Sequence, residues 1–169
     1  MTLTEMFLAE VDREAALSRR VLDRVPEGRN DWKPHEKSMA LGHLANLVAT
    51  MPAWIEMMIR TNEFEMRPNG EEWKPPAVPE TKAGLIEALD ASVAKAREAL
   101  SATTDEHLMR NWRFLVAGNL VDDRPRHLCI RDSVLSHLAH HRGQLTVYLR
   151  LVGSLVPAVY GPSADEGIF

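Results

Sequence analysis

The sequence predicts an all-α fold, a four-helix bundle formed by a single domain over residues 1–169. Four long segments carry apolar residues at spacings of three and four, which is the period of amphipathic helices. Turn-forming Gly and Pro residues separate these segments, and no run alternates clearly enough to predict a core strand. Amphipathic helices without a sheet to cover bury their apolar faces against one another, so a bundle is expected.

The composition narrows the class of protein. The 169 residues are 45% hydrophobic and 26% charged, as in a folded domain, and a formal charge of −4 argues against nucleic-acid binding. One cysteine, Cys129, rules out an internal disulfide and is expected to be buried. The first residues do not resemble a signal peptide, and no run approaches the ~20 apolar residues of a membrane span. We therefore expect a cytoplasmic protein without nucleic-acid or membrane partners.

The first two helices are expected over residues 4–25 and 38–61. The first should end at Pro26-Glu27-Gly28, where proline lacks an N–H and glycine is conformationally free. The second should open at Ser38, a residue type that caps helix N-termini. Pro52 lies inside the second helix and should kink it, because proline removes one backbone hydrogen bond.

The rest of the chain supplies two more helices and their connections. Residues 63–79 are rich in proline and predict a linker long enough to run the length of the bundle. A third helix is expected from residue 80 or 81 to residue 102. Residues 103–126 could include a short strand, but we expect a covering loop. The fourth helix should span residues 130–152 and end at Gly153, in the C′ position.

The fourth helix carries two histidines that lean toward the interior of the bundle. His137 and His141 are one turn apart, so their Cβ atoms should be roughly 6 Å apart. Two imidazole nitrogens with this spacing can converge on one ion at about 2.0–2.1 Å each. The alternative is that each ring is an ordinary core histidine with hydrogen-bonded nitrogens. His140 points away from this side and should meet solvent.

The sequence excludes two common kinds of metal site. Leu138 stands where the HExxH motif of metalloproteases has its glutamate, and no Glu-x-x-His tetrapeptide of a di-iron bundle occurs. A mononuclear, histidine-rich site with open positions would need a third ligand. His43 on the second helix could supply it from the edge of the apolar stripe, whereas Leu47, one turn further, points more squarely inward.

Other side chains could support such a site. Asp132 and Gln144 lie close enough along the helix to orient a ring N–H of a metal-bound histidine. Arg142 could pair with an anionic group of a substrate. Four aromatic side chains could form either pocket walls or ordinary core: Trp32, Trp54, Trp73 and Trp112.

These motifs resemble the DinB family, also called DinB/YfiT-like, over essentially the whole chain. The most specific is His137-x-x-x-His141-Arg142-Gly143-Gln144. Supporting stretches are Trp32-Lys33-Pro34, the segment KSMALGHL at residues 37–44 and the closing YGPSADE at residues 160–166.

The resemblance implies an up-up-down-down bundle with a long crossover, often a homodimer. It also implies a divalent metal, commonly nickel or zinc, held here by His43, His137 and His141. In the family pattern the helix-two histidine falls at position 47, where this chain has Leu47. Either His43 serves one turn earlier, or the site keeps two histidines.

Two function hypotheses follow. The first is a metal-dependent enzyme, a transferase or a hydrolase, that acts on a small molecule through a metal-bound thiol or water. Relatives in the family include S-transferases that use bacillithiol or mycothiol, a low-molecular-weight thiol co-substrate. The second is a non-catalytic, dimeric, stress-related bundle protein with a degenerate metal site. The leucine at position 47 supports the second.

Overall fold

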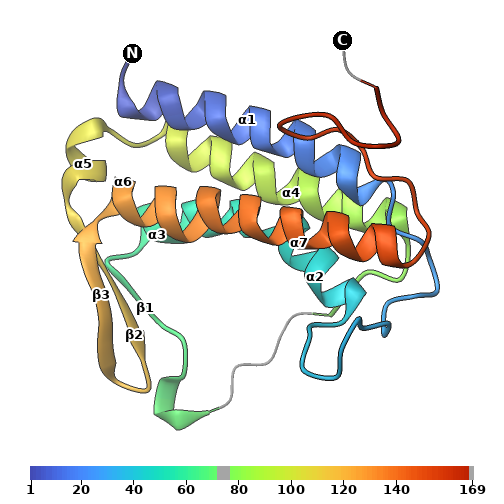
Figure 1. Ribbon diagram of the computed structural model, residues 1–169. Helices are drawn as coiled ribbons and strands as arrows, with labels where there is room; N and C mark the ends of the chain where they lie inside the picture. Colours follow the sequence, from blue (N-terminus) through green and yellow to red (C-terminus); the bar gives the residue numbers. More distant parts are fainter. Residues whose placement is uncertain (72–76, 168–169) are drawn as a thin grey trace.

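The computed structural model describes residues 1–71 and 77–167, and its body is a bundle of helices (Figure 1). Its rods are formed in order by α1 (Leu3–Leu22), α2 (Leu41–Thr50) with α3 (Trp54–Arg60), α4 (Lys82–Ser101), and α6 (Arg126–Cys129) leading to α7 (His137–Leu151). A short helix, α5 (Asp105–Met109), follows α4 at one end of the bundle. A mainly helical bundle is therefore present, as the apolar periodicity predicted, but the described residues form more helices than the four expected.

The order of helix directions differs from the expected one. α4 runs antiparallel to α1 and parallel to α2 and α3, as the pairs Asp12–Arg97, Arg19–Asp90, Ala49–Ser92 and Arg60–Glu98 show. Figure 1 shows α7 running in the direction of α1. The topology is up-down-down-up, so the expected up-up-down-down order is wrong. The crossover lies between α3 and α4, because α2 already begins at the end of the bundle where α1 stops.

Polar groups satisfy the free N–H groups at the start of α1. Thr2 and Glu5 form a capping box, each binding the backbone N–H of the other. The carboxylate of Asp105, at the start of α5, accepts N–H groups of Leu3 and Thr4 at 2.9 and 3.1 Å. This contact ties α5 to α1 through a negative charge at a helix N-terminus.

The second rod confirms the kink at Pro52 but not the start at Ser38. A 3₁₀ turn, Met51–Ala53, separates α2 from α3. α2 begins at Leu41, whose N–H donates to the carbonyl of Trp32 at 2.8 Å, while the N–H of Gly42 donates to that of Asn30 at 3.0 Å. Because the preceding loop supplies these carbonyls, α2 needs no side-chain cap.

A three-stranded sheet corrects the all-α prediction. β1 (Glu63–Glu65) lies in the expected linker and pairs parallel with β2 (Asn111–Val116), which pairs antiparallel with β3 (Asn119–Pro125) in the expected covering loop. The two residues of the β2–β3 turn have positive φ, +50° at Ala117 and +77° at Gly118. The carboxylate of Glu65 accepts the N–H groups of both turn residues at 2.8 Å. β2 lies in the stretch where the sequence allowed a short strand, whereas the pairing with β1 and the contacts of Glu65 come from residues distant along the chain.

Arg126 joins the sheet to the bundle. It is 1% exposed, and its guanidinium donates to oxygens of α3, of the segment after α3 and of the start of β2, namely Met58 O, Thr61 O, Asn62 Oδ1, Arg110 O and Asn111 O. Burial, together with the nearby Arg110, lowers the pKa of Arg126. The single buried guanidinium thus donates to carbonyl groups at the end of α3 that would otherwise each need a separate hydrogen-bond donor.

The last rod is longer than expected and contains a wide turn. It begins at Arg126 rather than at residue 130, and residues Ile130–Ser136 form a π-helix directly before His137. The predicted end is confirmed, since Gly153 has φ +81° and the N–H of Ser154 donates to the carbonyl of Leu149 at 2.9 Å.

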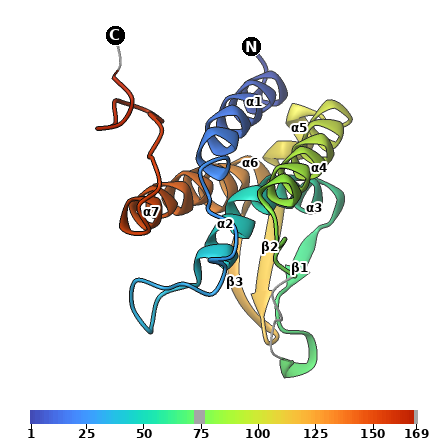
Figure 2. The ribbon, with the colours of Figure 1, turned by 90° about the vertical axis from the view of Figure 1, so that its right-hand side faces the viewer.

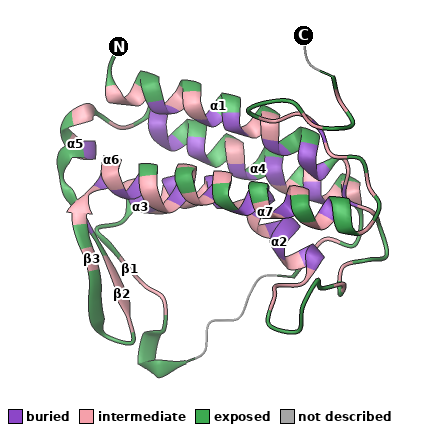
Figure 3. Cartoon of the chain, in the orientation of Figure 1, coloured by how far each residue is buried: buried purple, intermediate pink, exposed green. Residues whose placement is uncertain are grey.

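The buried side chains line the inner faces of the helices (Figure 3). They form one cluster around α2, α4 and α7 and a second beneath α5 and β2. Cys129 is a free, buried cysteine of the second cluster, as predicted. None of the helices in the described part of the chain combines the length and apolar character that a membrane span requires.

Candidate metal centre

The two histidines predicted on the last helix lie together in the structure. The ring centroids of His137 and His141 are 4.4 Å apart. His141 is buried, with 7% of its surface exposed, and His137 is half-buried. His140 is exposed, as predicted, with its ring centroid 5.2 Å from that of His141. The helix therefore presents two neighbouring imidazoles on its inner side.

Gln144 orients the buried ring. Its Oε1 lies 2.8 Å from Nδ1 of His141, so Nδ1 is the protonated donor and Nε2 keeps a free lone pair. Burial lowers the pKa of His141, and the nearby His137, His140 and His43 lower it further, whereas the bond to Gln144 opposes this change. A neutral imidazole with one free nitrogen is the form that binds a metal ion.

The register between α2 and α7 decides which residue faces this pair. The hydroxyl of Tyr148 donates to the carbonyl of Met39 at 3.3 Å, and the Trp54 ring lies 6.2 Å from that of His137. The two rods are therefore antiparallel, and interpolation between these two contacts places Leu47 closer than His43 to the level of His141. His43 lies one helical turn closer to Tyr148. Figure 2 shows α2 lying between α7 and α4.

The fit to a three-histidine metal site is partial. Two imidazoles are adjacent, and one has its tautomer set by an amide oxygen, as metal-binding histidines require. Over residues 1–71 and 77–167, however, no three His, Cys, Asp or Glu side chains come together in a way that could hold an ion. The side chain of Leu47 is half-buried and packs against the core cluster.

Two further predicted residues have other partners. Arg142 is 1% exposed and forms a buried ion pair with Glu14 of α1, so it is not free to bind a substrate. Asp132 lies in the π-helix, and its carboxylate pairs with Arg124 and Arg131 at 2.8 Å each. These two arginines hold the carboxylate of Asp132, and no hydrogen bond joins it to either histidine ring among the described residues.

The tryptophans divide between the site and the core. Trp54 is half-buried beside His137 and can form a wall of the site. Trp32 packs edge-on against Tyr148 at 5.7 Å, and Trp112 is buried and donates to the hydroxyl of Thr61 at 3.1 Å. Trp73 lies outside the described residues.

Two solved structures share this fold. A DinB-like protein from Bacillus cereus ATCC 10987 superposes with a TM-score of 0.68 and 22% identity, over 92% of this chain and 97% of its own. The DinB-like protein YjoA from Bacillus subtilis superposes with a TM-score of 0.66 and 18% identity, over 93% of this chain and 99% of its own. These likenesses establish the fold.

The sequence comparisons establish the family. A stretch of 33 residues is 48% identical to the uncharacterized protein YrdA of Bacillus subtilis (strain 168), and it spans 20% of each chain. The DinB family itself matches over residues 1–167, which include the histidine pair and the closing YGPSADE segment. This chain therefore belongs to the DinB family.

Proposed function

We propose that this protein is a metal-dependent enzyme in which His137 and His141 bind one divalent ion, nickel or zinc. The observation that carries the proposal is the bond between Gln144 and Nδ1 of His141, which leaves Nε2 of a neutral, buried imidazole beside a second ring. His43 on α2, one helical turn before Leu47, is the further imidazole proposed to complete the site. Nickel and zinc both accept imidazole ligands, so the donor set suits either.

The chemistry proposed is transfer of a low-molecular-weight thiol, of the bacillithiol or mycothiol type, to a small electrophile. A divalent ion lowers the pKa of a bound thiol, so that the thiolate nucleophile forms near pH 7. In this chain Gln144 fixes the orientation of His141, and Trp54 supplies an apolar wall beside His137. Assembly as a homodimer is part of the proposal, and sedimentation equilibrium tests it.

A second function is supported by one observation. The described residues form no group of three His, Cys, Asp or Glu side chains that could hold an ion. A bundle that has lost its third ligand would serve as a non-catalytic, stress-related protein, binding metal weakly or not at all.

Metal analysis of protein prepared without a histidine tag separates the two functions. The enzyme proposal expects one equivalent of metal in the wild type, lost in His141→Ala and kept in His35→Ala, a control at an exposed histidine. It also expects thiol transfer to a chromogenic electrophile that follows the metal content. Wild-type protein that stays metal-free after loading with nickel or zinc would support the non-catalytic function instead.

A further inference from the structure

The segment after α7 crosses back over two helices. Figure 1 shows this segment, residues 154–167, leaving α7 and running back beside the C-terminal part of α1, and its side chains pair with residues of both helices. In the described part of the chain, the backbone of this segment makes one hydrogen bond to the helices, from Ser154 to Leu149 at its base. Contacts of side chains must therefore hold the rest of it in place.

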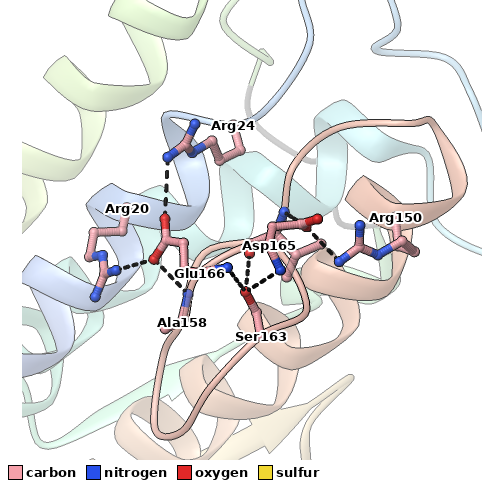
Figure 4. A network of polar contacts seen from close by, with 8 residues as sticks. Arg20, Arg24, Arg150, Ala158, Ser163, Asp165 and Glu166 are labelled. Carbon is pink, nitrogen blue, oxygen red and sulfur yellow. Dashed lines mark hydrogen bonds and ion pairs between the residues drawn. The ribbon is translucent and has the colours of Figure 1, made fainter. Parts of the chain in front are cut away.

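Two carboxylates attach this segment to the bundle (Figure 4). Glu166 pairs with Arg20 and Arg24 of α1, the latter at 3.3 Å, and Asp165 pairs with Arg150 of α7 at 2.6 Å. The three arginines are between 38% and 49% exposed, so dissolved salt can screen these pairs.

The same carboxylates also hold the segment in its own shape. Asp165 accepts the N–H of Val156 at 2.8 Å, and Glu166 accepts that of Ala158 at 3.0 Å. Ser163 donates to the carbonyl of Val156 and accepts the N–H groups of Asp165 and Glu166. Because the internal and external contacts share the same oxygens, loss of the arginine pairs weakens the whole segment together.

Tyr160 reaches from this segment into a buried ion pair. Its hydroxyl donates to the carboxylate of Glu14 at 2.6 Å and accepts from Arg142, while the Arg142 guanidinium lies 5.1 Å from the tyrosine ring centroid. Glu14 is 5% exposed and Arg142 is 1% exposed, whereas Tyr160 is 57% exposed. Nε of Arg142 is the one buried side-chain polar atom of the described residues that lacks a hydrogen-bond partner. The buried ion pair between α1 and α7 is thus in contact with a residue that is itself more than half exposed.

We propose that residues 154–167 form an electrostatic strap that opens as a unit while the helices stay folded, with Tyr160 as its latch. Few apolar contacts oppose opening. They come from Val156 and Val159, which are partly buried against the core, and from Pro157, which is buried. Opening exposes the Glu14–Arg142 pair to water. That pair joins α7 to α1, and Arg142 directly follows His141. The strap is thereby a conformational device that couples the C-terminal segment to the helix carrying the histidine pair.

Amide hydrogen exchange of the full-length protein, read by NMR, tests the strap. The amides of Val156, Ala158 and Glu166 report on it, and those of Leu89 and Leu145, both fully buried, report on the bundle. Raising NaCl from about 0.05 to about 1 M, where the screening length falls to about 3 Å, should accelerate exchange of the strap amides only.

Variants locate the latch. Tyr160→Phe should raise the exchange rates of the strap amides about threefold to tenfold at each salt concentration, because it removes the hydroxyl that contacts both charges. Leu155→Ala, at an exposed position of the same segment, should leave those rates unchanged. Glu166→Gln, which leaves the buried pair intact, should reduce the dependence on salt, and it keeps the test valid if Tyr160→Phe does not fold. Strap and core amides that exchange at one common rate, or strap rates that ignore salt, would overturn the proposal.

Discussion

The side-chain oxygen of Gln144 lies 2.8 Å from Nδ1 of His141 and so determines which ring nitrogen is free. Removing this partner should weaken metal binding, because the imidazole loses both its tautomer and its orientation. We expect Gln144→Leu to raise the Kd for zinc or nickel about 10- to 100-fold. Competition with a chromogenic chelator measures this, with Thr146→Ala as the control on the same helix. Equal affinities in Gln144→Leu and the wild type would show that the hydrogen bond has no role in metal binding.

Leu47→His should strengthen metal binding, because it places an imidazole on the facing helix closer than His43 to the level of His141. We expect the Kd to fall at least about tenfold, an effect of the size that single supporting groups have at metal sites. Leu47→Phe adds a ring without nitrogen and is the matched control. His43→Ala in the wild-type background completes the comparison. If His43→Ala abolishes binding while Leu47→His changes nothing, the third ligand position belongs to His43 and not to position 47.

Arg126→Met should destabilise the protein by at least about 3 kcal/mol, because it leaves several buried carbonyl oxygens without donors. Chemical denaturation monitored by circular dichroism gives the change in the free energy of unfolding. Arg131→Met is the control, since Arg131 is 62% exposed and forms a surface pair, and a change within about 1 kcal/mol is expected there. A similar decrease in the free energy of unfolding in both variants would contradict the structural role of Arg126.

Two glycines in helices should respond in opposite directions to alanine. A Cβ at Gly42 would lie 2.8 Å from Cγ of Asn30, whereas one at Gly143 meets no atom within 4 Å. We expect Gly42→Ala to cost about 1–3 kcal/mol through this overlap, and Gly143→Ala to stabilise by about 0.5–1 kcal/mol through helix propensity. Thermal unfolding of both variants checks the sign. If Gly42→Ala raises the melting temperature instead, the Asn30 side chain moves aside at little energetic cost.

The strap should open at both extremes of pH. Arg150 lowers the pKa of Asp165, and the N–H of Ala158 together with Arg20 and Arg24 lowers that of Glu166. The stability these carboxylates contribute is present above their unfolded pKa values of about 4 and is lost as the pH falls through their lower folded values.

At high pH the hydroxyl of Tyr160 becomes the sensitive group. Burial and the bond to Glu14 raise its pKa, so its contribution is complete below the unfolded value of about 10 and is lost as the pH rises through the folded value. Fluorescence of a dye attached near residue 164 should report release of the strap at each extreme. In Tyr160→Phe the alkaline transition should disappear, and its persistence would assign that transition to another group.

The sequence by itself determined the elements that depend on nearby residues. The apolar period predicted the helices, Pro52 predicted the break between α2 and α3, and Gly153 predicted the end of α7. The four-residue spacing of His137 and His141 brought their rings together because neighbours one turn apart share a helix face. These outcomes follow from local geometry, which does not require knowledge of the rest of the fold.

Only the tertiary structure decided how the elements combine. Distant contacts, Met39 with Tyr148 and Trp54 with His137, set the register of α2 against α7 and place Leu47 closer than His43 to the level of His141. Arg142 is buried because Glu14 lies opposite it on α1. The sheet likewise depends on pairing between β1 and a strand far along the chain. These contacts join residues that are distant in the sequence, so no local pattern predicts them. They stabilise the protein only once the helices have packed together.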